Sequence, residues 1–301
     1  MLHEIKRSEK TYRFGAESTP CCEITSGDYV LFHTQDAHSG TIDIGTVFAD
    51  VPFPELDENT GNPVTGLVYV KGAKKGNTLK VRILQITPEA VGVLPVRAYM
   101  GILRDVVPER TARIVRYSDN KLWISDTISV PARPMIGTIG VAPAGQQIPT
   151  AFPGSHGGNL DNNLITTGSV VYFPIYQDGA FLGVGDIHAA MGDAEMTCGG
   201  ADICAHVLVQ VEVEDRALVT KNPIVVRDNS VTTHGFGETY EESSAMACEE
   251  MRELMKEKML VSDYESVLLM AARGDLGLCQ ACRCQIPMIV RVTFPIIWKE
   301  R

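Results

Sequence analysis

Alternation of apolar and polar side chains predicts β-strands over most of the chain. Residues 79–86 (LKVRILQI) and 204–220 (CAHVLVQVEVEDRALVT) alternate with a period of two, as half-buried strands do. Residues 170–176 and 181–184 are β-branched and aromatic runs, and the QDG between them predicts a hairpin that pairs the two strands. Because Gly and Pro turns separate the strands at short intervals, we expect a β-sandwich or barrel rather than a parallel α/β sheet.

The pattern changes to helical spacing near the C-terminus. Residues 240–259 are rich in Ala, Met, Glu and Lys and predict an amphipathic helix. Ser262 and Glu265 form a capping box that begins a second helix. We therefore expect a mainly β protein with a β-sandwich or jelly-roll-like body over residues 1–221. A smaller, tightly integrated α+β portion over residues 222–301 holds the two helices and a last strand.

One stretch of the body, residues 154–195, concentrates side chains that can bind a metal ion. Asp186 and His188 lie two residues apart on a predicted strand, so both point to one face. A single histidine near a strand end is more often a hydrogen-bonded structural residue than a ligand, but a cluster of ionisable residues beside small ones favours a site. Imidazoles and carboxylates that converge on one point are typical of catalytic zinc. The six residues are His156, Asp161, Asp186, His188, Asp193 and Glu195.

Three motifs of this stretch resemble the acetamidase/formamidase family: HGGNLDN at 156–162, a GS-strand-FP unit at 168–174 and GDIHAAMGDAE at 185–195. The resemblance implies a β-rich hydrolase of small amides with a divalent metal ion, often zinc, near these motifs. Two positions depart from the family pattern, which commonly has Gln where Met191 stands and Gly where Ala194 stands. The resemblance therefore implies the fold more firmly than the substrate.

The resemblance also implies a candidate metal ligand earlier in the sequence. The family has an acidic residue near its active site at the position of Asp36, although Asp36 is equally suited to cap the turn that follows it. The expected metal ligands are His156, Asp186, His188 and Asp36. The expected catalytic carboxylates are Glu195, Asp193 and Asp161. We expect Glu195 to transfer protons and the other two to orient ligands, but which carboxylate is the general base stays open.

These assignments predict metal-dependent hydrolysis of small aliphatic amides, such as formamide or acetamide, to carboxylate and ammonia. Zinc is the expected ion and calcium the alternative. A divalent ion polarises the carbonyl, and a carboxylate moves a proton from water to the departing amine. Two alternatives stay open: hydrolysis of another amide such as a lactam, and a non-catalytic β-sandwich binding protein stabilised by a metal ion. Histidine ligands would count against calcium, which prefers oxygen.

Net charge and composition limit the kinds of molecule that this protein is expected to bind. The net charge of −10 and the pI near 5.2 argue against nucleic acid, because no basic face would neutralise phosphates. The sequence has neither an apolar run long enough to span a membrane nor a secretory signal, so we expect no membrane partner and a cytoplasmic location. Eight cysteines without a disulfide-framework spacing agree with this. A homo-oligomer, most simply a dimer, is expected.

The cysteines are weaker candidates for metal binding or catalysis. Cys279, Cys282 and Cys284 form the motif CQACRC, and three thiols this close can bind a metal ion. Structural zinc usually takes four ligands, however, and the sequence has no second CxxC pair, so buried free thiols are expected. Cys198 is the only thiol near the metal motifs, and no G-x-S-x-G elbow is present. Nucleophilic catalysis by cysteine or serine is therefore poorly supported.

Overall fold

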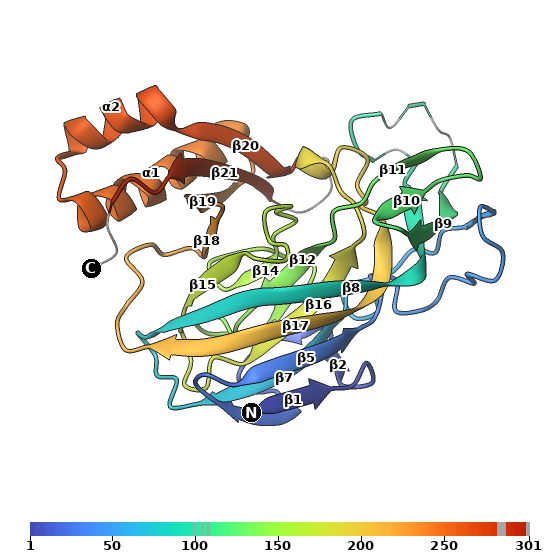
Figure 1. Ribbon diagram of the computed structural model, residues 1–301, viewed down its shortest axis with the longest axis horizontal. Coiled ribbons are helices and arrows are strands. Elements are labelled where there is room, and N and C mark those ends of the chain that lie inside the picture. The colour runs from blue at the N-terminus through green and yellow to red at the C-terminus, as the bar shows by residue number, and fades with distance from the viewer. Residues whose placement is uncertain (99, 104, 107–108, 282–286, 299–301) are drawn as a thin grey trace.

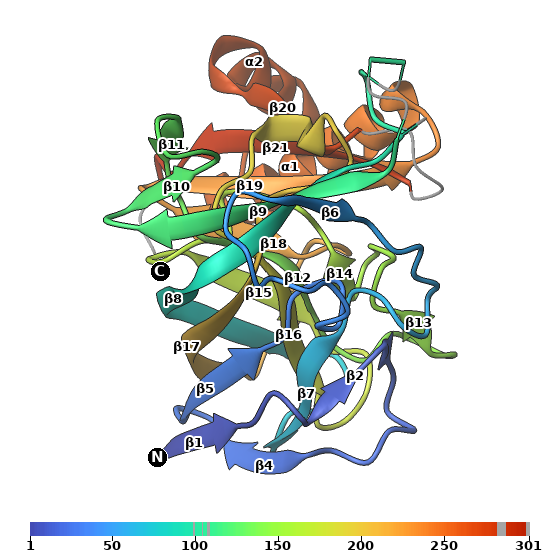
Figure 2. The ribbon, with the colours of Figure 1, turned by 90° about the vertical axis from the view of Figure 1, so that its right-hand side faces the viewer.

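The computed structural model describes residues 1–98, 100–103, 105–106, 109–281 and 287–298 of the chain. Strands dominate it, as predicted, and two helices lie near the C-terminus (Figure 1). Two sheets form the body, and a third sheet, which carries the helices, continues the first (Figure 2). No helix in the described ranges combines the length and the apolar character needed to cross a membrane.

The first sheet is built on two long antiparallel strands, β8 and β17, whose register runs from Thr78 opposite Glu214 to Val93 opposite Asp202. Strand β5 pairs with the other edge of β17, and β1 lies parallel to β5. Strand β15 pairs with the beginning of β8, and β9 with its end. The bounds are β1 Leu2–Ile5, β5 Tyr29–Thr34, β8 Thr78–Val96, β9 Thr111–Ser118, β15 Val170–Pro174 and β17 Asp202–Glu214. Short strands extend β9: β6 Asp50–Pro52, β10 Lys121–Trp123 and β11 Ser129–Pro131.

The second sheet has β16 and β7 at its centre. Strand β16 pairs with β7 and β12, β7 also pairs with β2 and β4, and β12 pairs with β14. The bounds are β2 Lys10–Thr11, β4 Cys22–Thr25, β7 Val64–Lys71, β12 Met135–Gly140, β14 Gly157–Asn159 and β16 Leu182–His188. A separate two-stranded ribbon joins β3 Arg13–Phe14 to β13 Ile148–Pro149.

The apolar faces of the two sheets form one hydrophobic core, so the body is a β-sandwich. The alternation in residues 79–86 and 204–214 is confirmed, because the inward side chains of β8 and β17 are almost completely buried and the residues between them are mostly only partly buried. The strand predicted to continue to residue 220 ends at Glu214. Burial of each such side chain stabilises the fold by about 1.5–3 kcal/mol. Core residues from the two sheets include Leu79, Val81, Val207, Val209, Ile139 and Val184.

The predicted hairpin over residues 170–184 is wrong. Its two strands belong to different sheets: β15 pairs with β8 and β18, whereas β16 pairs with β7 and β12. Ala180 and Phe181 have φ values of 57° and 61°, so the chain turns away from the first sheet instead of folding back along β15. Every residue of β16 is buried, which suits a strand covered on both faces better than a half-exposed hairpin strand.

The C-terminal portion is an antiparallel sheet in the order β18, β19, β21, β20, covered by the helices (Figure 1). Both predicted helices are confirmed, and each begins with a capping box, formed by Thr239 and Glu242 in α1 and by Ser262 and Glu265 in α2. The buried face of α1 packs on β19 and β21. The bounds are β18 Ile224–Arg227, β19 Ser230–Gly237, α1 Tyr240–Met259, α2 Asp263–Arg273, β20 Asp275–Gln280 and β21 Met288–Pro295.

The sheet is continuous from the body into this portion, because β15 pairs with β18. The division of the chain after residue 221 stays a prediction. Of the three clustered thiols, Cys279 is buried in β20, while Cys282 and Cys284 lie outside the described residues.

Candidate metal centre

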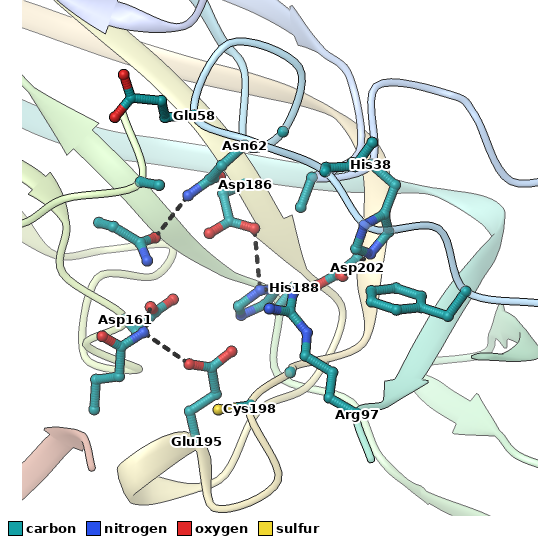
Figure 3. A pocket seen from close by; sticks show the side chains of 18 of the residues that line it. His38, Glu58, Asn62, Arg97, Asp161, Asp186, His188, Glu195, Cys198 and Asp202 are labelled. Carbon is teal, nitrogen blue, oxygen red and sulfur yellow. Dashed lines mark hydrogen bonds and ion pairs between the residues drawn. The ribbon is translucent and has the colours of Figure 1, made fainter. Parts of the chain in front are cut away.

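Two carboxylates and one imidazole meet where β16 ends (Figure 3). Donor atoms of Asp161, Asp186 and His188 all lie within 4.8 Å of one another. The three residues are between 1% and 4% exposed, so the group is almost completely shielded from water. The structure thus brings Asp186 and His188 together, as their spacing in the sequence predicts, and adds Asp161 to them.

The backbone around this group lets the two carboxylates approach closely. Asp161 and Asp186 have φ values of 44° and 53°, in the left-handed region that side chains rarely adopt. Gly137 on β12 lies between them, and a Cβ atom there would be 2.6 Å from Asp186 Oδ2 and 2.8 Å from Asp161 Oδ1. Only glycine leaves room for both side chains, so β12 contributes to the site through the absence of a side chain.

From this group, a row of alternating carboxylate and imidazole side chains continues across the junction of the two sheets. Within the described residues, β16 and β17 pair only at His188 and Asp202, which is where the two sheets meet. His188 Nε2 lies 3.2 Å from Asp186 Oδ1 and 3.0 Å from Asp202 Oδ1, and His38 Nε2 lies 2.6 Å from Asp202 Oδ2. Neither Asp202 nor His38 was among the site residues predicted from the sequence.

These contacts control the ionisation of the buried groups. Burial opposes the charge of Asp202, but hydrogen bonds from His188 and His38 outweigh it and lower the pKa of Asp202. Burial likewise opposes the charge of His188, yet Asp186 and Asp202 raise the pKa of His188 well above its ordinary value. The protein therefore stabilises positive charge at the position where a metal ion would bind.

Glu195 faces the group from the other side and is held by an amide. Gln280 Nε2 donates to Asp161 Oδ2 at 2.7 Å and to Glu195 Oε2 at 2.9 Å. Removal from water is the main cause that raises the pKa of Glu195 to about 7, and burial and the neighbouring Glu195 raise the pKa of Asp161. Gln280 comes from β20, so the C-terminal portion completes the site, which the sequence analysis did not predict.

The unpaired atoms of the group fit a cation. Asp161 Oδ1 and Asp186 Oδ1 are buried without a hydrogen bond among the described residues, and Asp186 Oδ1 has only its contact of 3.2 Å with His188 Nε2. Each unpaired polar atom of this kind costs about 1–3 kcal/mol, and a bound cation would offset part of that cost. Two carboxylates and an imidazole suit zinc or a similar divalent ion.

The group lies in the wall of a cavity of about 430 Å³. Glu195 and Asp202 also line this cavity, so the candidate metal ligands and the candidate proton-transfer residue face one space (Figure 3). Asn62 and Asn159 form a polar wall, joined by a hydrogen bond of 3.1 Å. Phe53 and Phe152 form an apolar wall. Such a space can hold a small polar ligand beside the carboxylates.

The other residues expected from the sequence lie outside this cavity. His156 is fully buried against Phe14, with ring centroids 5.3 Å apart, and burial lowers its pKa to about 4. Asp36 Oδ1 accepts hydrogen bonds from the backbone N–H groups of His38 and Gly40, so Asp36 caps a turn, which was the alternative role considered for it. The geometry does not bring His156 or Asp36 to the group, and their role as ligands stays a prediction.

Asp193 does not line the cavity either. It forms a two-pronged ion pair with Arg291 of β21, at 2.8 and 2.9 Å, and accepts a hydrogen bond from Asn163. It belongs to the short 3₁₀ helix η1 (Asp193–Glu195), in which Ala194 has φ 72°. Asp193 and Arg291 thereby fasten the turn that carries Glu195 to the C-terminal sheet.

A buried carboxylate–imidazole group at the junction of a β-sandwich defines a candidate metal centre, and comparison with known proteins defines the family. The chain belongs to the acetamidase/formamidase family, whose sequence model matches residues 3–151 and 146–242. The resemblance carried by the three motifs is confirmed.

Individual relatives agree with this assignment. The chain is 41% identical over 63 residues to a formamidase of Methylophilus methylotrophus, and 34% identical over 80 residues to an acetamidase of Mycolicibacterium smegmatis. These segments cover 21% and 25% of this chain and only 16% and 20% of the two relatives, so they are local matches.

Solved structures match over nearly the whole chain. A predicted acetamidase/formamidase from Thermoanaerobacter tengcongensis has a TM-score of 0.91 and 33% identity, covering 98% of this chain and 96% of that one. An acetamidase from Bacillus halodurans has a TM-score of 0.91 and 30% identity, covering 98% and 97%. A gamma lactamase from Delftia acidovorans, at 20% identity and a TM-score of 0.65 over 97% and 90% of the chains, shares the fold.

Proposed function

We propose that this protein is a metal-dependent amidohydrolase that converts a small amide and water to a carboxylate and ammonia. One observation carries the proposal: the buried group of Asp161, Asp186 and His188 opens on a cavity that also holds Glu195. Membership of the acetamidase/formamidase family supports the substrate class, because the relatives named above are formamidases and acetamidases. Zinc is the ion we propose.

Asp161, Asp186 and His188 would hold the ion. A divalent ion bound there supplies a Lewis acid that polarises a carbonyl and lowers the pKa of a water molecule. Asp202 positions His188, because its carboxylate contacts the imidazole at 3.0 Å and is itself held by His38. His156 and Asp36, the other two ligands expected from the sequence, are not in the group that we propose to hold the ion, and substitution tests their role.

Glu195 is the proposed general base and acid. It would accept a proton from the attacking water and donate it to the amine nitrogen as the carbon–nitrogen bond breaks. A pKa of about 7 suits this exchange, because both protonation states are populated near neutral pH. Gln280 holds Glu195 beside Asp161 through one amide nitrogen, so the base and a metal ligand keep a constant separation.

The experiment that tests this proposal measures both metal and ammonia. Purified protein is assayed for metal content by mass spectrometry and for ammonia release from formamide, acetamide and propionamide, before chelation, after chelation and after zinc is added back. We expect activity to fall with the metal content and to return with zinc. Absence of ammonia from folded, zinc-loaded protein would reject hydrolysis of these amides and favour a metal-stabilised binding protein.

Two further expectations belong to the proposal. A lactam such as γ-butyrolactam is the alternative substrate, and ring opening is measured as appearance of the amino acid. A cytoplasmic homo-oligomer, most simply a dimer, is the expected form of the protein, and sedimentation of the purified chain tests the oligomeric state.

A further inference from the structure

Arg97 extends into the cavity toward His188 (Figure 3). Its guanidinium stacks on the ring of Phe53, 5.2 Å from the centroid. Its Nε is buried without a hydrogen-bond partner. Within the described part of the chain, no carboxylate lies close enough to the guanidinium to form an ion pair. A cation held on an aromatic face beside the candidate metal centre therefore keeps its hydrogen-bond donors unused.

Arg110, which also lines the cavity, and Arg13, which lies next to it, both have carboxylate partners. Arg110 stacks on the same Phe53 ring at 5.6 Å, but it forms an ion pair of 3.2 Å with Glu55. Arg13 forms an ion pair of 2.5 Å with Glu58, another lining residue. Arg110 and Arg13 thus each form an ion pair with a carboxylate, whereas Arg97 forms none within the described residues and acts on Glu195 only through its charge.

The planar guanidinium suits one kind of ligand. A guanidinium is planar, and two N–H groups on one edge match the two oxygens of a carboxylate. Such bidentate pairing is stronger and more selective than a single neutral hydrogen bond. Arg97 is therefore preorganised for a carboxylate.

The size of the cavity agrees with a ligand that reaches from the metal centre to Arg97. Acetamide has four non-hydrogen atoms and fills on the order of 100 Å³, judged from the roughly 30 Å³ that one water occupies in the liquid. The cavity measures about 430 Å³. Acetamide would leave most of this space to water, whereas a longer acyl chain would fill it.

We infer that the substrate is an amide whose acyl chain ends in a carboxylate, a monoamide of a short dicarboxylic acid, and that Arg97 binds this carboxylate. The inference rests on the proposed amide hydrolysis. Water adds its oxygen to the amide carbon, the carbon–nitrogen bond breaks, and the nitrogen leaves as ammonia with one proton from water. The ammonia then takes the proton of the new carboxyl group. The products are a dicarboxylate and ammonium, and the carboxylate on Arg97 takes no part in the bond changes.

A second role for Arg97 must be separated from this one. Burial raises the pKa of Glu195, and the charge of Arg97 opposes that rise, so Arg97 also acts as a counter-charge for the site. Loss of a counter-charge would impair every substrate equally. Loss of a carboxylate-binding residue would impair only substrates that carry the carboxylate.

The experiment compares monoamides with diamides of equal length. The substrates are the monoamides of malonic, succinic and glutaric acids, each paired with its neutral diamide, in which an amide of the same shape replaces the carboxylate. Wild type is compared with Arg97→Gln and Arg97→Lys. Arg116→Gln is the matched control, because Arg116 also stacks on aromatic rings, Phe48 and Trp123, but does not line the cavity.

We expect wild type to favour the best monoamide over its diamide by roughly 10-fold to 100-fold in kcat/KM, as a charged hydrogen-bond pair allows. Arg97→Gln should abolish this preference through a higher KM for the monoamide, Arg97→Lys should keep part of it, and Arg116→Gln should keep all of it. Equal hydrolysis of both members of each pair by wild type, or equal loss of both in Arg97→Gln, would overturn the inference.

A binding measurement separates this inference from the proposed function. If folded, zinc-loaded protein releases no ammonia from any amide, the proposed function fails. Calorimetric titration of succinamate into wild type and Arg97→Gln then tests Arg97 alone. Binding to wild type but not to the variant supports the carboxylate site, and absence of binding to wild type overturns it.

Discussion

The middle of the sandwich and the junction of its two sheets are equally buried but are built from opposite chemistry. In the middle, β8 and β17 direct side chains such as Val81 and Val209 into the core, and both are 0% exposed. At the start of the same strand β17, Asp202 is 3% exposed and faces His188. Burial stabilises the first region, whereas in the second it costs stability and changes the pKa of the groups it encloses. The apolar core therefore holds in place a charged group that does not favour folding by itself.

The largest effect should come from removing a ligand of the group. We expect His188→Gln to lose the bound ion and to lower kcat/KM by at least about 10³-fold, because the ion supplies several kcal/mol of transition-state stabilisation. His156→Gln is the matched comparison and should keep the ion, since His156 packs on Phe14 outside the cavity. Metal content and circular dichroism of both variants check this, and equal metal loss in the two folded variants would restore His156 as a ligand.

Glu195→Gln should lower kcat by about 10²–10⁴-fold, the usual contribution of a positioned general base. The amide keeps the size of the side chain, and Glu195 is not one of the three candidate ligands, so the metal content should not change. Steady-state kinetics with zinc in excess give the measurement. A variant with nearly normal kcat would exclude Glu195 from proton transfer.

Asp202→Asn tests the support behind the candidate metal centre. The substitution removes the negative charge that holds His188 and His38, so we expect the metal affinity to fall by about 10–100-fold while the fold is kept. Activity should recover partly at high zinc concentration, unlike in His188→Gln. Competition with a chromogenic chelator measures the affinity, and an unchanged affinity would show that Asp202 does not position the ligand.

The pH dependence should follow the raised pKa of Glu195. A general base must be ionised in the free enzyme, and a pKa of about 7 means that Glu195 becomes protonated as the pH falls through 7. We expect kcat/KM to be constant above this value and to fall about tenfold per pH unit below it. This limb should be absent from the residual activity of Glu195→Gln. Full activity of wild type at pH 5 would contradict the assignment.

The smallest effect on activity should come from the core. Leu79→Ala creates a cavity at a fully buried position and should lower the free energy of unfolding by about 2–5 kcal/mol. Activity per folded molecule and metal content should not change, because Leu79 does not line the cavity of the site. Thermal or urea unfolding gives the first quantity. A parallel loss of metal from folded protein would show that the two regions are coupled more tightly than the structure implies.

Local signals predicted the regular elements well. The helix predicted over residues 240–259 is α1, Tyr240–Met259, and the capping box at Ser262 begins α2, because capping and apolar spacing act within one or two turns. The hairpin prediction failed because strand partners depend on the path of the whole chain. Strands β15 and β16 are adjacent in the sequence, but β15 pairs with β8 in the first sheet and β16 pairs with β7 in the second.

The site was predictable only in part, because some of its contacts join residues that are far apart in the sequence. Asp186 and His188 are two residues apart, so strand geometry was enough to join them. The hydrogen bonds from Gln280 to Asp161 and from His38 to Asp202 span 119 and 164 residues, and no local pattern marks such partners. An acidic residue between the apolar residues Ala201 and Ile203 was the one available signal for Asp202, since a buried acid needs a partner.

The position of Gln280 also determines when the site can first exist. Its amide reaches Asp161 and Glu195 from β20, which follows both helices in the chain and is held by β21. A nascent chain on the ribosome can bury much of the sandwich core early, but it lacks this amide until β20 has emerged. Synthesis itself therefore delays assembly of the complete site until both helices and β20 have been made.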